Sequence, residues 1–183
     1  GVMNNTRQYA IIVHRNAGCT YGVNDEPYEK HLDMVYRWVL KYTHIFKSND
    51  DFENVCAAAY THDVIEDAQQ TYNNVKDVTN TDIADITLAV TDIHEKNRML
   101  RFLSTAPKIL KDYRALILKI CDIAANASYG KSERSSMYKK YQSEWKYKRF
   151  IFITAAKWYT NELDLNKFAE LIQDVDKVME YNA

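Results

Sequence analysis

The segment from Tyr60 to Asp67 carries the side chains best suited to chemistry, because His62 and Asp63 are adjacent and Glu66 and Asp67 follow. Glu66 lies four residues after His62, and Asp67 lies four after Asp63. If a helix continues for one more turn, each pair lies on one side and all four groups cluster. Neutral imidazole and carboxylate are good ligands for divalent metals. The segment therefore indicates a metal site, and the alternative is a helix end with solvent-exposed acids and a capped histidine.

Two residues elsewhere in the chain have the types that would complete such a site. His31 falls on or beside the buried stripe of a helix, where a lone histidine is often a core residue bonded to backbone. Asp122 lies in the most apolar stretch of the chain, and an ionised carboxylate is rarely buried without a cation or several donors. Lys119 is the structural alternative for that cation. Asn126 shares the face of Asp122 and can supply amide contacts. Two histidines and two aspartates from three helices would make a site suited to Mn²⁺, Fe²⁺, Ni²⁺ or Zn²⁺.

Helices must position these residues, because the chain of 183 residues has only four Gly and two Pro. A sandwich or barrel needs a turn signal every 8–12 residues, and six such residues cannot supply that. Apolar residues instead recur at spacings of three and four, which is typical of buried helix faces. The length favours one domain. We therefore expect an all-α, single-domain bundle of about seven or eight helices covering residues 1–183.

Breaks between the helices are predicted from punctuation and polarity. Residues 18–27 contain two Gly and a Pro and are predicted to form a loop. Residues 68–80 are polar with no clear period. Pro107 indicates a break or a helix start, and Gly130 is expected to end the apolar helix before it. The helices within 137–181 are expected to pack on the rest of the domain.

Composition limits the partners and the compartment. Twenty-four basic residues balance 25 acidic ones, and the pI is near 6.6, so no polymeric nucleic acid is expected as a partner. No apolar run reaches the length of a membrane span and no signal pattern begins the chain, so no membrane association is expected. Three widely spaced Cys without a CxxC motif favour a reducing, cytoplasmic location. The oligomeric state is left open, with a homodimer as one candidate.

Three motifs, taken in order, resemble a known family. They are Tyr28-Glu29-Lys30-His31, then His62-Asp63-x-x-Glu66-Asp67, then Leu118-Lys119-Ile120-Cys121-Asp122-x-x-x-Asn126. This set resembles the HD-domain metal phosphohydrolases, and most of all the hydrolase domain of the RelA/SpoT family and its small stand-alone relatives. The resemblance spans residues 9–130 and implies an all-helical HD-domain bundle.

The resemblance also implies roles for individual residues. The family hydrolyses the guanosine tetra- and pentaphosphate alarmones, removing pyrophosphate from the 3′ position, typically with one Mn²⁺ ion. The matching positions here are the metal ligands His31, His62, Asp63 and Asp122, the acidic pair Glu66 and Asp67 that positions and activates the attacking water, and the nucleotide-contacting Asn126.

General chemistry agrees with these roles. A bound metal lowers the pKa of its water and polarises a phosphoryl oxygen, and a nearby carboxylate can accept the proton. Phosphoryl transfer also needs positive charge around the phosphates. The candidates for this charge are Lys119 and a basic cluster of Lys96, Arg98 and Arg101.

The chain departs from the family pattern in two segments. The loop before His31 reads Tyr21-Gly22-Val23-Asn24-Asp25-Glu26-Pro27 and contains no Lys or Arg. Gly22 falls about where the family has an Arg that stacks on the guanine. Tyr21 and Tyr129 are candidate aromatic walls for a base instead. The segment from Asp122 to Asn126 also lacks the Arg that the family places after its Asp.

The leading hypothesis is therefore a Mn²⁺-dependent nucleotide phosphohydrolase, with alarmone 3′-pyrophosphohydrolysis as its most specific form. A 5′-nucleotidase, or another nucleotide phosphohydrolase of the HD superfamily, is the second interpretation. A metal-stabilised nucleotide-sensing module without turnover is the third. The intact pair of Glu66 and Asp67 counts against both alternatives.

Overall fold

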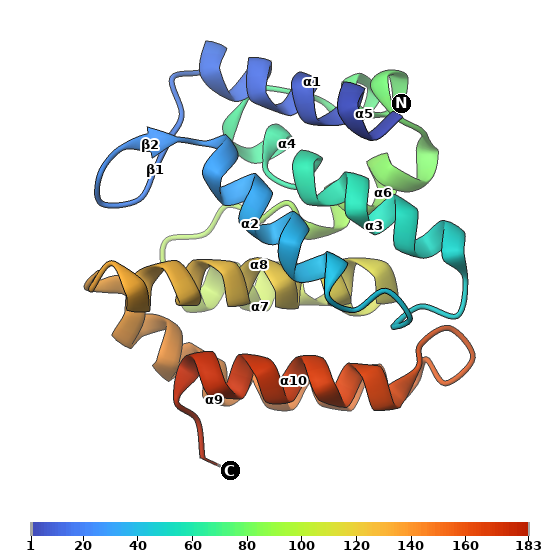
Figure 1. Cartoon of the computed structure of the whole chain (residues 1–183), viewed down its shortest axis with the longest axis vertical. Coiled ribbons are helices and arrows are strands. Elements are labelled where there is room, and N and C mark those ends of the chain that lie inside the picture. Colours follow the sequence, from blue (N-terminus) through green and yellow to red (C-terminus); the bar gives the residue numbers. More distant parts are fainter. Residues whose placement is uncertain (1, 183) are drawn as a thin grey trace.

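The computed structural model describes residues 2–182 and is almost entirely helical (Figure 1). In the described chain there are ten helical segments and one two-stranded antiparallel hairpin. Two segments have only four and seven residues, which leaves eight longer helices, as the composition predicts. The elements are α1 (Val2–Asn16), β1 (Thr20–Tyr21), β2 (Glu26–Pro27), α2 (Glu29–Leu40), α3 (Asn49–Thr61), α4 (Val64–Asp67), α5 (Tyr72–Val78), α6 (Thr81–Val90), α7 (Arg98–Leu110), α8 (Tyr113–Ser132), α9 (Met137–Ala156) and α10 (Leu165–Met179).

Helix α8 is the centre of the bundle. Thirteen of its twenty residues are buried, because its apolar side chains surround the helix rather than forming one stripe. In Figure 1 it crosses the middle of the molecule, with α1 to α3 on one side and α9 and α10 on the other. Helices α2, α3, α6, α7, α9 and α10 all contact it. A polar residue on α8 therefore faces other elements at almost any position.

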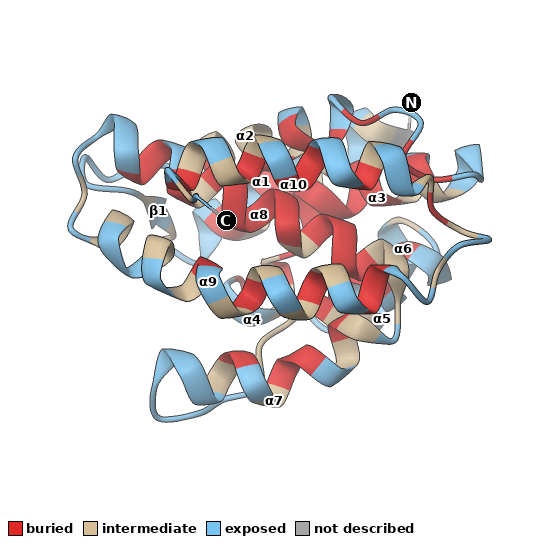
Figure 2. Cartoon of the chain, turned by 90° about the horizontal axis from the view of Figure 1, so that it is seen from below, coloured by how far each residue is buried: buried red, intermediate tan, exposed pale blue. Residues whose placement is uncertain are grey.

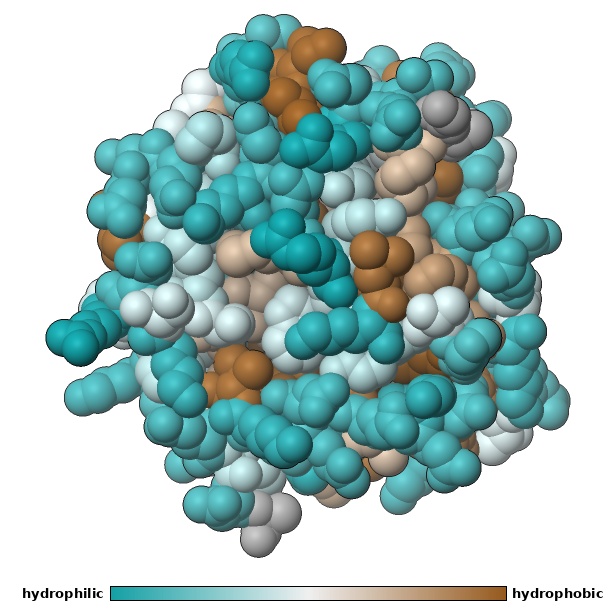
Figure 3. All heavy atoms as spheres, in the orientation of Figure 1, coloured by the Kyte–Doolittle hydropathy of each residue, from teal (hydrophilic) through white to brown (hydrophobic). Residues whose placement is uncertain are grey.

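The surrounding helices are amphipathic and turn their apolar faces inward. In Figure 2 the buried residues are concentrated in the interior between the helices, and the exposed residues lie on the outside. Helix α2 buries Leu32, Val35 and Val39 at spacings of three and four, and α9 buries Trp145 and Phe152. The face shown in Figure 3 is mostly hydrophilic, with hydrophobic side chains in small separate areas. None of the described helices is long and apolar enough to span a membrane.

Three local expectations are wrong, for identifiable reasons. The polar segment 68–80 contains α5, which buries only Val75 and so lacks an apolar period; its start is fixed instead by a capping box between Thr71 and Asn74. Pro107 lies inside α7 on its exposed side, where water can satisfy the carbonyl group that loses its partner. Gly130 does not end α8, which continues to Ser132.

Candidate metal centre and adjoining pocket

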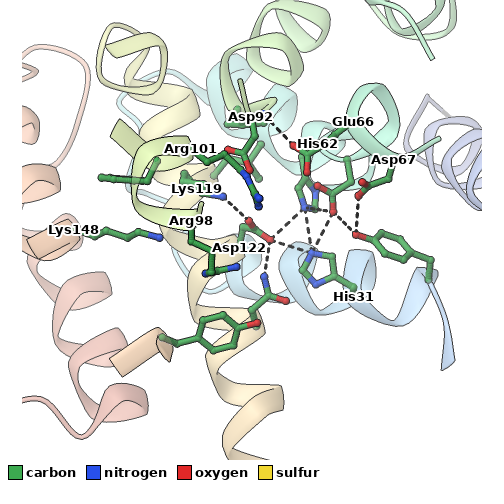
Figure 4. Close-up of a pocket in the computed structure, with 17 residues that line it drawn as sticks. His31, His62, Glu66, Asp67, Asp92, Arg98, Arg101, Lys119, Asp122 and Lys148 are labelled. Atoms are coloured by element: carbon green, nitrogen blue, oxygen red, sulfur yellow. Dashed lines mark hydrogen bonds and ion pairs between the residues drawn. The ribbon is translucent and has the colours of Figure 1, made fainter. Parts of the chain in front are cut away.

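The four predicted ligands come together from three parts of the fold. His31 lies on the first turn of α2, His62 and Asp63 join α3 to α4, and Asp122 lies in the middle of α8. Both histidines are almost fully buried, and their ring nitrogens point toward the two carboxylates (Figure 4). The structure thus brings together residues that are up to 91 positions apart in the chain.

The spacing of the ligand atoms fits one metal ion. The Nε2 atoms of the two imidazoles are 3.2 Å apart. His31 Nε2 lies 3.5 Å from Asp63 Oδ2 and 3.0 Å from Asp122 Oδ1, and His62 Nε2 lies 3.0 and 3.3 Å from the same two oxygens. Ligand atoms held about 2.1 Å from one ion lie about 3.0 to 3.4 Å from their neighbours in octahedral or tetrahedral geometry. The nitrogen and oxygen donors of this cluster therefore suit a first-row divalent cation.

Neighbouring groups fix the orientation of the ligands. The carbonyl oxygen of Ala59 lies 2.7 Å from His62 Nδ1, so this nitrogen carries the proton and Nε2 is left as the donor to a metal. Lys119 Nζ donates to Asp122 Oδ2 at 3.1 Å, which leaves Oδ1 facing the imidazoles. Lys119 and the metal cluster thus use different oxygens of one carboxylate, so the structural alternative for Lys119 and the metal hypothesis are compatible.

The electrostatics of the cluster favour a cation at its centre. Burial lowers the pKa of the His62 imidazole, but Asp63 and Asp122 outweigh this effect and hold the pKa well above its usual value. Burial raises the pKa of Asp122, yet Lys119 and the two imidazoles hold it well below its ordinary value. The raised pKa of His62 and the lowered pKa of Asp122 both show that positive charge is strongly stabilised between these carboxylates.

The acidic pair lies beside the metal cluster. Asp63 is the residue that precedes the single turn of α4, and Asp67 N donates to Asp63 O at 2.9 Å. Carboxylate oxygens of Asp63, Glu66 and Asp67 then lie within 4.8 Å of one another. The backbone N–H of Asp92 donates to Glu66 Oε1 at 3.0 Å. The three carboxylates therefore lie together as the spacing predicts, although α3 ends at Thr61 and the turn between them belongs to the separate helix α4.

Both acids have a perturbed affinity for protons. Desolvation by the pocket wall, together with the carboxylates of Asp92, Asp63 and Asp67, raises the pKa of Glu66 to about 7. Desolvation and Asp63 raise the pKa of Asp67 to about 6. Carboxyl groups with such pKa values can accept and release a proton near neutral pH.

The opposite wall of the pocket is cationic. The pocket has a volume of about 220 Å³, and Figure 4 shows the metal cluster and the acids on one side of it. The cationic side is formed by Arg98 and Arg101 from α7, Lys119 from α8 and Lys148 from α9. Lys96 is exposed in the loop before α7 and is not among the residues that form the wall, so its expected substrate contact is not supported.

A second hollow, of about 270 Å³, adjoins the pocket through Asn126 and Tyr141. Tyr21 and Tyr129 form its wall, with ring centroids 4.8 Å apart. Tyr21 Oη donates to Asn126 Oδ1 at 2.7 Å, and its ring stacks on His31. The two predicted aromatic walls therefore lie next to each other, and they are connected to the metal cluster through Asn126.

The structure explains why the loop has a glycine at position 22. Gly22 has φ +77°, and a Cβ atom there would lie 2.1 Å from Tyr129 Oη. The ring of Tyr129 thus occupies the space that any side chain at position 22 would need.

Sequence reasoning missed four polar residues of the pocket: Tyr28, Asp92, Tyr141 and Lys148. Tyr28 Oη donates to Asp63 Oδ2 at 2.6 Å and lies 3.5 Å from Asp67 Oδ2. Lys148 could have been found from the sequence, because a lysine in the apolar stripe of α9 is unusual. Asp92 contributes its backbone N–H, which no residue pattern reveals.

Comparisons with known proteins support the fold. No family model and no curated protein sequence matches the chain. Among solved structures, the chain is similar to one described as a metazoan ortholog of SpoT that hydrolyzes ppGpp and plays a role in starvation responses. The TM-score is 0.72 at 18% sequence identity, and the alignment covers 98% of this chain and 94% of the other. At this identity the likeness shows a shared all-helical fold, the one that the HD-domain motifs predict.

Proposed function

We propose that the protein is a metal-dependent nucleotide phosphohydrolase, and that its most specific reaction is removal of pyrophosphate from the 3′ position of guanosine tetra- or pentaphosphate. One observation carries the proposal: one pocket has two imidazoles and four carboxylates on one side and four cationic side chains on the other. Phosphoryl transfer requires these two kinds of wall together, because the transferred group is anionic and its attacking water must be deprotonated.

The metal ligands in this proposal are His31, His62, Asp63 and Asp122, and the proposed ion is Mn²⁺. Their nitrogen and oxygen donors also suit Fe²⁺, Ni²⁺ or Zn²⁺. When bound, the ion supplies Lewis-acid polarisation of a phosphoryl oxygen and lowers the pKa of a water molecule.

The remaining roles belong to side chains of the pocket. Glu66 and Asp67 accept the proton of the attacking water, which their raised pKa values permit near pH 7. Arg98, Arg101 and Lys119 face the phosphate groups. The base side of the nucleotide is assigned to the hollow formed by Tyr21, Tyr129 and Asn126, where an aromatic ring can stack on a base.

The choice of substrate has independent support. The solved structure with a TM-score of 0.72 is described as hydrolyzing ppGpp. A nucleoside monophosphate carries a single phosphate group and would leave part of the cationic wall unused. We therefore place the 5′-nucleotidase interpretation second.

The test is a nucleotide panel with Mn²⁺ added, containing guanosine tetra- and pentaphosphate and nucleoside monophosphates, with phosphate and pyrophosphate measured separately. We expect pyrophosphate from the alarmones. The double variant Glu66→Gln, Asp67→Asn should lose about 10²- to 10⁴-fold in kcat. The matched control Asp50→Asn, Glu53→Gln changes two exposed acids of α3 and should retain activity. Undiminished activity of the first variant would refute the assignment of these acids, and phosphate from monophosphates alone would favour the 5′-nucleotidase.

We further propose that residues 1–183 form one domain in which α9 and α10 complete the bundle, since both contact α8. A cytoplasmic location and a homodimer stay predictions. The three cysteines are free, which is compatible with a reducing compartment.

A further inference from the structure

Lys148 is a buried ammonium group in an apolar part of α9. The residue is only 7% exposed and lies between the buried side chains of Trp145 and Phe152 on the same helix. Its Nζ atom lies 4.7 Å from the centroid of the Phe102 ring. Burial of a charge is costly unless an opposite charge and hydrogen bonds compensate it. The position therefore needs an explanation beyond packing.

The counter-charge of Lys148 is shared with another cation. Lys148 Nζ lies 3.2 Å from Glu144 Oε1. Arg98 holds the same carboxylate with two hydrogen bonds, from Nε to Oε2 at 2.6 Å and from Nη2 to Oε1 at 3.0 Å. One negative charge thus serves two positive ones. Lys119 does not relieve this imbalance, because it is itself a cation and pairs with Asp122, which also faces the metal cluster.

These groups surround a small hollow between α7, α8 and α9. Its volume is about 50 Å³, and it shares Arg98, Lys119, Asp122, Asn126, Tyr141 and Lys148 with the main pocket. In Figure 4 the charged ends of Lys148, Arg98 and Lys119 point toward the same region beside Asp122. A cavity needs about 10–15 Å³ of this volume to hold one water molecule, so the hollow has room for about four water molecules. A phosphate group, with five heavy atoms, is of similar size.

The charge balance of this hollow favours the binding of an anion. Among the described residues that form it, three are cationic and two are carboxylates, and Asp122 is already committed to the imidazoles. The loop 18–27 supplies no positive charge on its side of the pocket, because it contains no Lys or Arg and Tyr129 fills the space at Gly22. Positive charge for a second phosphate group is therefore concentrated on α7, α8 and α9.

We propose that the hollow between α7, α8 and α9 is an anion subsite in which Lys148 and Arg98 bind a phosphate group other than the one attacked. When no phosphate is bound, Glu144 is the counter-ion of these two side chains. The inference rests on the proposed function for the identity of the substrate. It implies selection of a pyrophosphate group over a single phosphate, because only the former reaches both the metal cluster and the subsite.

The test is calorimetric titration of inorganic pyrophosphate and, separately, phosphate into chelator-treated, full-length protein. Wild-type protein should bind pyrophosphate more tightly than phosphate, because in the absence of the metal ion the more highly charged anion gains more from the same cationic side chains. Lys148→Met should weaken pyrophosphate binding at least tenfold, and Lys148→Arg should stay within about threefold of wild type because it keeps the charge. Glu144→Gln should tighten binding severalfold, because it removes the competing carboxylate. Lys146→Met, an exposed lysine of the same helix, should change nothing.

The opposite signs separate the subsite from a purely structural ion-pair network. If Lys148→Met and Glu144→Gln both weaken binding, or neither changes it, or wild-type protein does not bind pyrophosphate, the subsite is wrong. Circular dichroism checks that each variant is folded. In the Mn²⁺-loaded protein, Lys148→Met should raise KM for the hydrolysed substrate and leave Mn²⁺ affinity unchanged. Pyrophosphate binding through Lys148 without hydrolysis of any nucleotide would support the subsite and refute the proposed function.

Discussion

The buried charge of Lys148 on α9 should lower the free energy of unfolding of the protein. Burial, and the nearby charge of Lys119, lower the pKa of Lys148 from its ordinary 10.5 to about 8. Each pKa unit corresponds to about 1.4 kcal/mol, so the charged form of Lys148 costs about 3 kcal/mol in the folded protein at pH 7. Lys148→Met removes the charge and keeps an apolar stem of similar length. We expect the variant to be more stable by about 3 kcal/mol, or about 6–12 °C in Tm for a chain of this size.

The sign of the effect depends on pH in a defined way. Below pH 8 both the folded and the unfolded states carry the proton on Lys148, so the full penalty is present. Between pH 8 and 10.5 only the unfolded state binds it, so the contribution of Lys148 to stability rises with pH. Above 10.5 the penalty disappears. The advantage of Lys148→Met should therefore be largest near pH 7 and should shrink toward pH 10.

The assay is urea denaturation of wild type, Lys148→Met and the control Lys146→Met at pH 7 and pH 10. Differences between variants at one pH are the measured quantity, because the many tyrosines also titrate near pH 10. The control should match wild type at both pH values. A less stable Lys148→Met variant at pH 7, or an advantage that does not change with pH, would refute the reasoning.

Two further predictions concern single hydrogen bonds. Tyr28→Phe removes the donor to Asp63 Oδ2 and should weaken Mn²⁺ binding by about 10-fold in titration calorimetry. The control Tyr72→Phe loses a similar hydrogen bond to a surface carboxylate and should leave Mn²⁺ affinity unchanged. Equal Mn²⁺ affinities of the two variants would contradict a role of Tyr28 in orienting Asp63. Partial burial raises the pKa of Asp33, but the hydrogen bonds that Arg7 and Tyr60 donate to it outweigh burial and lower the pKa below 3.8. The ionised Asp33 therefore stabilises the folded state above pH 3.8, and this stabilisation is lost as the pH falls through the lowered pKa. Asp33→Asn should therefore cost about 1 kcal/mol at pH 7 in urea denaturation and progressively less as the pH falls below 3.8, and a pH-independent loss would show that charge is not the cause.

The combination of a stability penalty and a proposed binding role at Lys148 has a physical reason. A charge is useful for binding an anion when water is excluded from it, and the same exclusion makes it destabilising in the free protein. Glu144 and the ring of Phe102 reduce that cost without removing it. Lys148→Met should thus gain stability and lose pyrophosphate affinity in one substitution.

The sequence by itself was sufficient for relations that act over one helical turn. The spacing of His62, Asp63, Glu66 and Asp67 predicts their cluster, because positions four apart lie on one side of a helix regardless of what packs around them. The all-helical fold also follows from apolar periodicity and the scarcity of turn residues. Periodicity failed for α5, where capping by Thr71 defines the helix and only Val75 is buried.

Relations between distant segments were decided by the tertiary structure. A buried Asp122 indicates that a cation must be near, but only the packing of α2 and α3 on α8 places two imidazoles within 3.3 Å of one oxygen. Tyr129 fills the space beside Gly22, and Lys148 of α9 meets residues of α7 and α8 in the pocket. Such contacts depend on how helices cross, and residue types within one segment carry no information about the distance to another.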